Sequence, residues 1–221
     1  MTTNHIPTRE GSPTTPTRRP ARPNGHQVGL ALLAAATELR ASLRTPEFAA
    51  GAIAIPVILY AMFGLPNSDG ALPGGTAVGL VMAVSMCAYG VVSLAIFTFG
   101  DDVAKERGRG WTRTLSATPL PTWVYLVGKL ANALVLGTII VAAIAMLAVL
   151  MGGAELPLGT WVQLWLLMLA GVLAFSTLGF AIAYVARPRA AAMIANLVFL
   201  PLAFASGFFV PMNQLPEVLR D

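Results

Sequence analysis

The densest group of side chains capable of chemistry lies between Gly100 and Trp123, in the string GDDVAKERGRGWTRTLSATPLPTW. The apolar runs on either side, 76–99 and 130–151, carry no charged residue, whereas this segment holds seven within 13 positions. Each charge buried in lipid would cost several kcal/mol, so we expect a polar loop where two membrane spans meet water. We interpret it as a contact surface through which a soluble partner acts. Its charged residues are Asp101, Asp102, Lys105, Glu106, Arg107, Arg109 and Arg113.

Residues suited to catalysis or metal binding are sparse elsewhere. Cys87 is the single cysteine and lies in an apolar run, while His5 and His26 fall in the N-terminal tail, so no zinc or iron site is expected. The pair Gly128–Lys129 resembles the end of a phosphate-binding loop, but the first glycine of that motif is missing and Leu130 replaces its Ser/Thr. We therefore expect no catalytic, cofactor-binding or metal-binding residue in this chain.

Composition assigns the chain to the bilayer. It has 221 residues, of which 56% are hydrophobic and 11% charged, and its mean hydropathy is +0.72. Ordinary soluble domains carry about 25% charged residues. The net charge of +4 comes from basic residues in the tail and loops, so membrane topology and anionic lipid explain it better than nucleic acid does.

The N-terminal region divides into an arm and a helix. Residues 1–27 are rich in Thr, Pro and Arg, which predicts a disordered basic cytoplasmic arm. Arg18-Arg19 and the following apolar run 28–36 imitate a twin-arginine signal peptide. The apolar periodicity continues past that run, however, beside a polar stripe, which favours an amphipathic helix over 28–44 in the membrane interface. The apolar stripe is Leu32, Ala36, Leu39 and Leu43, and the polar stripe is Thr37, Arg40 and Arg44.

Five apolar runs predict five membrane-spanning helices, because a span needs roughly 20 apolar residues. We expect the helix of the third run to begin early, at Thr118, and Lys129 to extend back toward the headgroups. Pro201 predicts a kink in the fifth helix. The fold class is therefore all-α and polytopic, with an interfacial helix before the spans. The runs are 48–64, 76–99, 130–151, 161–186 and 190–212.

Loop charges predict the orientation. Basic residues occur in the arm and interfacial helix, in 100–129 and in the turn 187–189. The alternate loops 65–75 and 152–160 contain none. Under the positive-inside bias the basic side is cytoplasmic. The N-terminus is then inside the cell, and the segment after residue 212 is outside.

The spans contain only mildly polar groups. None of the five runs holds Asp, Glu, Lys, Arg or His, which argues against a proton- or sodium-coupled carrier and against an intramembrane protease. Ser85, Tyr89 and Ser93 recur every four residues on one helix face, and Asn196 is the amide of the fifth run. They either make helix–helix hydrogen bonds or line a weakly polar path for an amphiphilic substrate.

Several motifs of the chain occur in the order and spacing of a known family. Together they resemble the permease subunits of type-2 ABC exporters of the drug and natural-product efflux type. The resemblance runs from about Val28 to the C-terminus. The motifs are Arg44-Thr45-Pro46, Val103-Ala104-Lys105-Glu106-Arg107, Gly110, Leu115, Thr118-Pro119-Leu120, Gly128-Lys129-Leu130, Ser206-Gly207, Pro211 and Leu215-Pro216.

The resemblance implies a transport subunit in the plasma membrane rather than an enzyme. Such a permease pairs with a second permease copy, as a homodimer or heterodimer, and with cytoplasmic ATP-binding subunits that use ATP and Mg²⁺. A coupling helix over 110–117 would dock on the ATPase, and spans two and five would line the path, with Ser85, Tyr89, Ser93 and Asn196 on it. The implied coupling residues are Glu106, Arg107, Arg109, Gly110, Trp111, Arg113 and Leu115.

Two departures from the family stand out. Gly108-Arg109 and Trp111-Thr112 replace the family's usual Glu and Gly-Thr-Leu. The family also continues into a sixth span, so residues 28–221 are expected to be a transmembrane domain that is incomplete at its C-terminus, from a truncated or fragmentary chain. The alternatives are a secondary carrier or channel that needs no ATPase, and a membrane enzyme or scaffold. An uncharged interior favours drugs, lipids or hydrophobic natural products as substrate.

Overall fold

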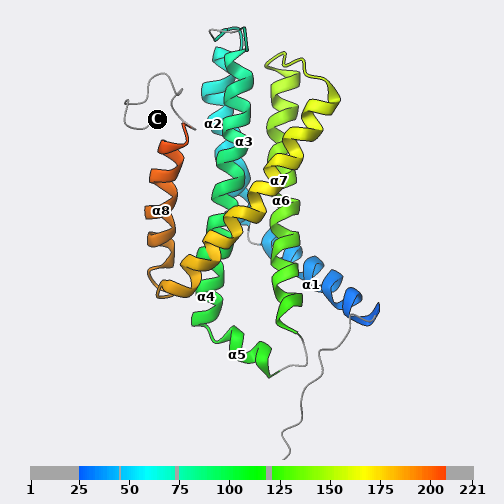
Figure 1. The fold of residues 1–221 in the computed structure, drawn as a ribbon, viewed down its shortest axis with the longest axis vertical. Helices are drawn as coiled ribbons and strands as arrows, with labels where there is room; N and C mark the ends of the chain where they lie inside the picture. The colour runs from blue at the N-terminus through cyan, green and yellow to red at the C-terminus, as the bar shows by residue number, and fades with distance from the viewer. Residues whose placement is uncertain (1–24, 45, 73–74, 118–120, 208–221) are drawn as a thin grey trace, which may run out of the picture.

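A computed structural model describes residues 25–44, 46–72, 75–117 and 121–207 of the chain (Figure 1). These residues form helices joined by short turns, and residues 1–24 of the expected arm and the end of the fifth run lie outside them. The expected boundary at residue 28 is wrong by three residues, because the first helix begins at Gly25. The α-helices are α1 (Gly25–Arg44), α2 (Pro46–Leu59), α3 (Val78–Phe97), α4 (Val103–Gly108), α5 (Trp111–Ser116), α6 (Thr122–Leu150), α7 (Leu158–Val185) and α8 (Ala191–Ala205). Two π-helical turns, η1 (Tyr60–Gly64) and η3 (Thr98–Asp102), and a 3-10 turn, η2 (Leu65–Asn67), continue α2 and α3.

The all-α polytopic fold is as predicted. Three continuous helices, Val78–Gly108, Thr122–Leu150 and Leu158–Val185, are long and apolar enough to cross a membrane. They correspond to the second, third and fourth apolar runs. The first and fifth runs form shorter apolar helices within the described part of the chain, Gly51–Asn67 and Ala191–Ala205.

The long helices pack around α3, with α6 beside it and α7 crossing it obliquely (Figure 1). Glycine permits a close approach at the crossing of α3 and α7. A Cβ atom on Gly179 would lie 2.8 Å from Cβ of Phe99 and 3.0 Å from the carbonyl oxygen of Ala95. Small residues let membrane helices approach in this way and gain dispersion contacts where lipid gives no hydrophobic drive.

The sequence analysis predicted a loop from Gly100 onward, and this prediction is wrong for the first part of the charged segment. The helix of α3 continues through η3 into α4 and ends at Gly108. The chain turns at Gly110, whose φ of +79° lies in the region that favours glycine, and α5 follows. A helix satisfies its own backbone hydrogen bonds, so it can extend past the lipid and carry charged side chains there.

Helix α1 crosses one end of α6 and projects from the bundle (Figure 1). Ala34 faces α6 so closely that a Cβ on Gly128 would lie 3.2 Å from the carbonyl carbon of Ala34. Of the expected apolar stripe, Leu39 packs on the core, whereas Leu32 and Leu43 are 67% and 55% exposed. Apart from Leu39, the helix thus turns small and polar residues toward α6 and exposes its leucines Leu32, Leu33 and Leu43, which fits an interfacial position.

Helix α6 begins at Thr122, with Pro121 in an extended conformation at the N-cap. The expected start at Thr118 lies outside the described residues. Pro201 stands inside α8, which continues through it to Ala205.

Candidate functional site at the elbow between α3 and α6

The elbow consists of α4, Arg109–Gly110 and α5. It packs against a buried ammonium group that α6 provides. Lys129 of α6 is only 3% exposed. Its Nζ donates to Glu106 Oε1 of α4 at 2.8 Å and lies 3.5 Å from Glu38 Oε1 of α1. Tyr125, one turn before Lys129, donates its hydroxyl to Glu106 Oε2. Three helices therefore meet at one charge.

The expectation that Lys129 extends toward the headgroups is wrong. Its ammonium instead points at two carboxylates of the protein. A buried charge is stable only when it is paired and hydrogen-bonded, and the carboxylates of α1 and α4 provide that pairing.

The two carboxylates differ in their surroundings. Glu106 is hydrogen-bonded through both oxygens, whereas Glu38 has the longer contact with the ammonium. Burial raises the pKa of Glu38, the charge of Glu106 raises it further, and the attraction of Lys129 opposes both, so that the pKa lies above its ordinary value of 4.5. A raised carboxyl pKa favours the protonated form in the folded state. The contribution of Glu38 to stability therefore falls as pH rises through this raised pKa.

We predict that Glu38→Gln leaves the stability at pH 7 within about 0.5 kcal/mol of wild type. The substitution removes the attraction to Lys129 but also removes the cost of burying a carboxylate, and the two effects oppose each other. Glu106→Gln is expected to cost about 2 kcal/mol, because it weakens the short bond to a buried ammonium. Thermal unfolding of the purified chain at pH 5 and pH 7 checks both. Raising the pH from 5 to 7 should destabilise wild type more than Glu38→Gln. An equal loss of stability in Glu38→Gln and Glu106→Gln would contradict this assignment.

Arg107 fixes the elbow to α7. Its Nη1 donates to the carbonyl oxygen of Tyr184 at 3.0 Å, and its Nη2 donates to that of Ala186 at 2.6 Å. Its guanidinium carbon lies 5.9 Å from the centroid of the Tyr184 ring. The last carbonyls of a helix have no partner within the helix, so the guanidinium caps α7. In addition, Gly108 leaves room for Pro188, to which an added Cβ would come within 2.7 Å.

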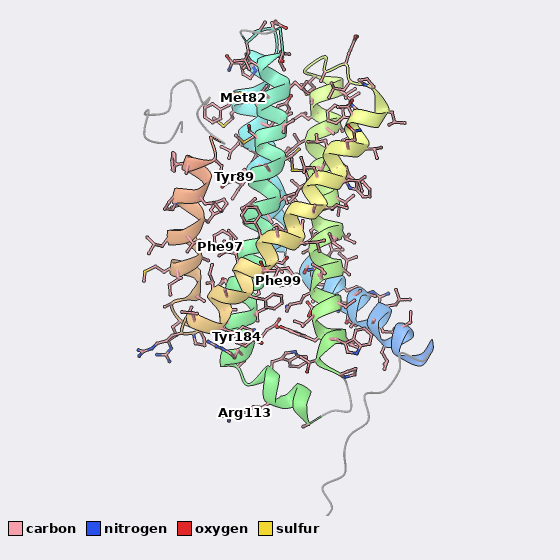
Figure 2. The ribbon with its side chains drawn as sticks, viewed as in Figure 1. Met82, Tyr89, Phe97, Phe99, Arg113 and Tyr184 are labelled. Carbon is pink, nitrogen blue, oxygen red and sulfur yellow. The ribbon has the colours of Figure 1, made fainter. Side chains whose placement is uncertain are left out.

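Helix α5 coincides with the coupling helix that the resemblance implies over 110–117. Figure 2 shows Arg113 on α5, at the opposite end of the helical bundle from the loop that joins α6 to α7. Trp111 is 47% exposed, and Arg109 and Arg113 are exposed too. The side chain of Leu115 lies outside the described part. The elbow therefore presents aromatic and basic groups outward, while Glu106 and Arg107 face the bundle.

Two hollows lie between α5 and α1. One, of about 260 Å³, is lined by Leu33, Trp111 and Val124 among others, and is largely apolar. The second, of about 460 Å³, is bounded by Glu106, Arg109 and Trp111. Trp111 thus stands between the two hollows. A displacement of α5 would change both of them.

The predicted path residues are only partly brought together. Tyr89 and Ser93 of α3 line one hollow between α2 and α3, and the Tyr89 ring centroid is 5.2 Å from that of Phe199 on α8. Ser85 is half-buried on the same helix. Asn196 is exposed on α8, donates to the Ala192 carbonyl at 3.0 Å and does not line that hollow. Their role in a path stays a prediction.

Glu38 and Tyr125 are site residues that the sequence analysis missed. The available signal was Lys129, because an ammonium at the start of a long apolar helix requires a partner charge. The carboxylates of α1 and α4 were the candidates within reach of that end of the helix. Local periodicity could not show that both carboxylates contact Lys129.

The helices and the elbow define an all-helical, multi-pass membrane protein. Salt bridges and hydrogen bonds connect the helices at its charged end. The family model described as ABC-2 type transporter matches residues 31–221, and the chain belongs to this family. A Bacillus subtilis (strain 168) protein named "Putative transport permease YvfS" is 26% identical over 185 residues, covering 83% of this chain and 75% of that protein. No solved structure matches the chain with significance. The chain is a transport permease rather than an enzyme.

Proposed function

We propose that the chain is the membrane-spanning subunit of an ATP-driven exporter and that a separate ATP-binding subunit docks on the elbow. The observation that supports this most is the bond between Lys129 and Glu106. It ties the segment that carries α5 to α6, and through Glu38 to α1. A force on α5 would therefore reach several helices at once.

The elbow has the connections that force transmission needs. Glu106 connects it to α6, Arg107 connects it to the end of α7, and α4 continues directly into α3 through η3. A push on Trp111 would thus move α3, α6 and α7 as a group rather than bend one loop. ATP binding in the partner can drive this change only if the partner binds one permease state more tightly than the other.

The remaining assignments follow from the same proposal. ATP and Mg²⁺ act in the partner, and a second permease copy completes the path. The N-terminus and the elbow face the cytoplasm across the plasma membrane, since basic residues accumulate on that side. Ser85, Tyr89, Ser93 and Asn196 are the proposed path residues, and hydrophobic drugs or natural products are the proposed cargo.

We predict that Trp111→Ala and Arg113→Glu each weaken association with the proposed ATP-binding subunit by at least about tenfold. A tryptophan at a protein contact commonly contributes this much, and reversing a charge adds repulsion if the facing surface is acidic. Co-purification of the two subunits from detergent-solubilised membranes measures the effect. Arg189→Glu in the α7–α8 turn is the matched charge reversal and should leave association unchanged.

Two outcomes would contradict the docking assignment. One is unchanged association in both α5 variants, and the other is an equal loss in Arg189→Glu. Unfolding temperatures of the variants must stay near wild type, so that lost association reports the contact surface. Transport by the full chain in vesicles without any ATPase would instead favour a secondary carrier or channel.

A further inference from the structure

A hollow of about 260 Å³ lies between α2 and α3. Gly51 and Pro56 of α2 face Tyr89 and Phe97 of α3 across it, and Asp101 bounds its end nearest the elbow. A Cβ built on Gly51 meets no atom within 4 Å, which shows how open this wall is. Apart from the carboxylate and the Ser93 hydroxyl, its lining is mainly apolar and aromatic. Sites for small molecules commonly combine such a lining with a few placed polar groups.

The carboxylate of Asp101 lacks one hydrogen bond. Its Oδ2 accepts from Lys105 Nζ at 2.6 Å. Its Oδ1 is buried and has no hydrogen-bond partner among the described residues, and the side chain as a whole is 13% exposed. An ionised carboxylate only accepts hydrogen bonds, so the missing partner is a donor. A cationic donor makes the strongest such bond.

The backbone at this point is also unusual. Asp101 belongs to the π-helical turn η3, as does Thr98, whose Oγ1 is likewise buried without a hydrogen-bond partner in the described part of the chain. Two oxygens of one turn are thus left unsatisfied. Isolated π-helical turns occur frequently at functional sites, and buried polar atoms without partners require an explanation.

Aromatic rings extend from the carboxylate along the hollow. Tyr89 and Phe97, which are labelled in Figure 2, line it. Their ring centroids lie 5.2 and 5.8 Å from that of Phe199 on α8. Asp101 lies 12 positions after Tyr89, which corresponds to roughly 18 Å of helix. A ligand could therefore place a charge at Asp101 and an apolar body against the rings, whose faces also attract cations.

We propose that this hollow binds a compact amphiphilic cation, an organic ammonium compound. Its N–H group donates to the Asp101 carboxylate, and its apolar body lies against Phe97 and extends toward Tyr89. The charge stays near water, because Lys105, which shares the carboxylate, is 47% exposed. That the bound cation is cargo rests on the proposed export function, whereas its binding does not.

The test compares 2-(naphthyl)ethylammonium with the uncharged 2-(naphthyl)ethanol. Binding of each to the full chain in lipid nanodiscs is measured by naphthalene fluorescence, without nucleotide or ATPase, and with empty nanodiscs subtracted. The ammonium compound should bind at least about tenfold more tightly than the alcohol. Asp101→Asn should lower affinity for the ammonium by about tenfold or more and for the alcohol by less than about twofold.

Two further variants separate the site from general effects. Gly51→Leu fills the hollow and should abolish binding of both compounds, while Glu155→Gln removes a distant carboxylate and should change neither. Equal affinity for the two compounds, equal losses in Asp101→Asn, or no binding to wild type would each overturn the proposal. Because no ATPase is present, these results are independent of whether α5 docks on one.

Discussion

Lys129→Met is expected to lower the free energy of unfolding by about 3 kcal/mol. The substitution removes the only positive charge that the described structure places between Glu38 and Glu106 and leaves two carboxylates facing each other. Breaking a buried pair by removing one partner costs about 3–5 kcal/mol. We expect the lower end because the carboxylate side chains are 25% and 26% exposed, so water compensates part of the loss.

Thermal unfolding of the full chain in detergent, followed by tryptophan fluorescence, measures this change. Lys105→Met is the matched control, because its pair with Asp101 is exposed on the lysine side and spans one helical turn. Such pairs contribute less than about 1 kcal/mol. Adding Glu106→Gln to Lys129→Met should restore part of the lost stability. Equal effects of the two lysine variants would show that Lys129 is not the centre of the cluster.

Hydropathy and length predicted the three long membrane helices, because an apolar run must form its own hydrogen bonds in lipid and therefore becomes a helix. The same reasoning failed at Gly100, where the appearance of charge was taken as the end of the helix. The helix continues instead to Gly108. A charged side chain does not end a helix; a glycine with positive φ does, and that glycine is Gly110.

The site was predictable only in outline. The short helix α5 was expected from the resemblance, which also implied Glu106 and Arg107 among the coupling residues. The link from Glu106 to Lys129 joins positions 23 residues apart, and Glu38 is farther still. Such pairs depend on how α1 and α4 pack against α6, and one sequence contains no direct record of that packing.

Gly179→Ala is expected to destabilise the protein by about 2 kcal/mol. The added methyl carbon would lie 2.8 Å from Cβ of Phe99, 3.0 Å from the Ala95 carbonyl oxygen and 3.2 Å from the Gly100 nitrogen. Two of these atoms are backbone and the third is attached to it, so none can move without moving α3 or η3. Overpacking of this kind costs about 1–3 kcal/mol, more than the helix propensity gained by replacing glycine.

Gly171→Ala, two turns earlier on α7, is the matched control. Its methyl carbon would make only an ordinary contact, 3.7 Å from Val91 Cγ1. The same change of residue in the same helix should there be neutral or stabilising by up to about 1 kcal/mol, since alanine is the better helix former. The two variants should therefore differ by about 2–3 kcal/mol in thermal unfolding. Similar stabilities would mean that α7 does not cross α3 at Gly179, and the connection from η3 to the elbow would need a different geometry.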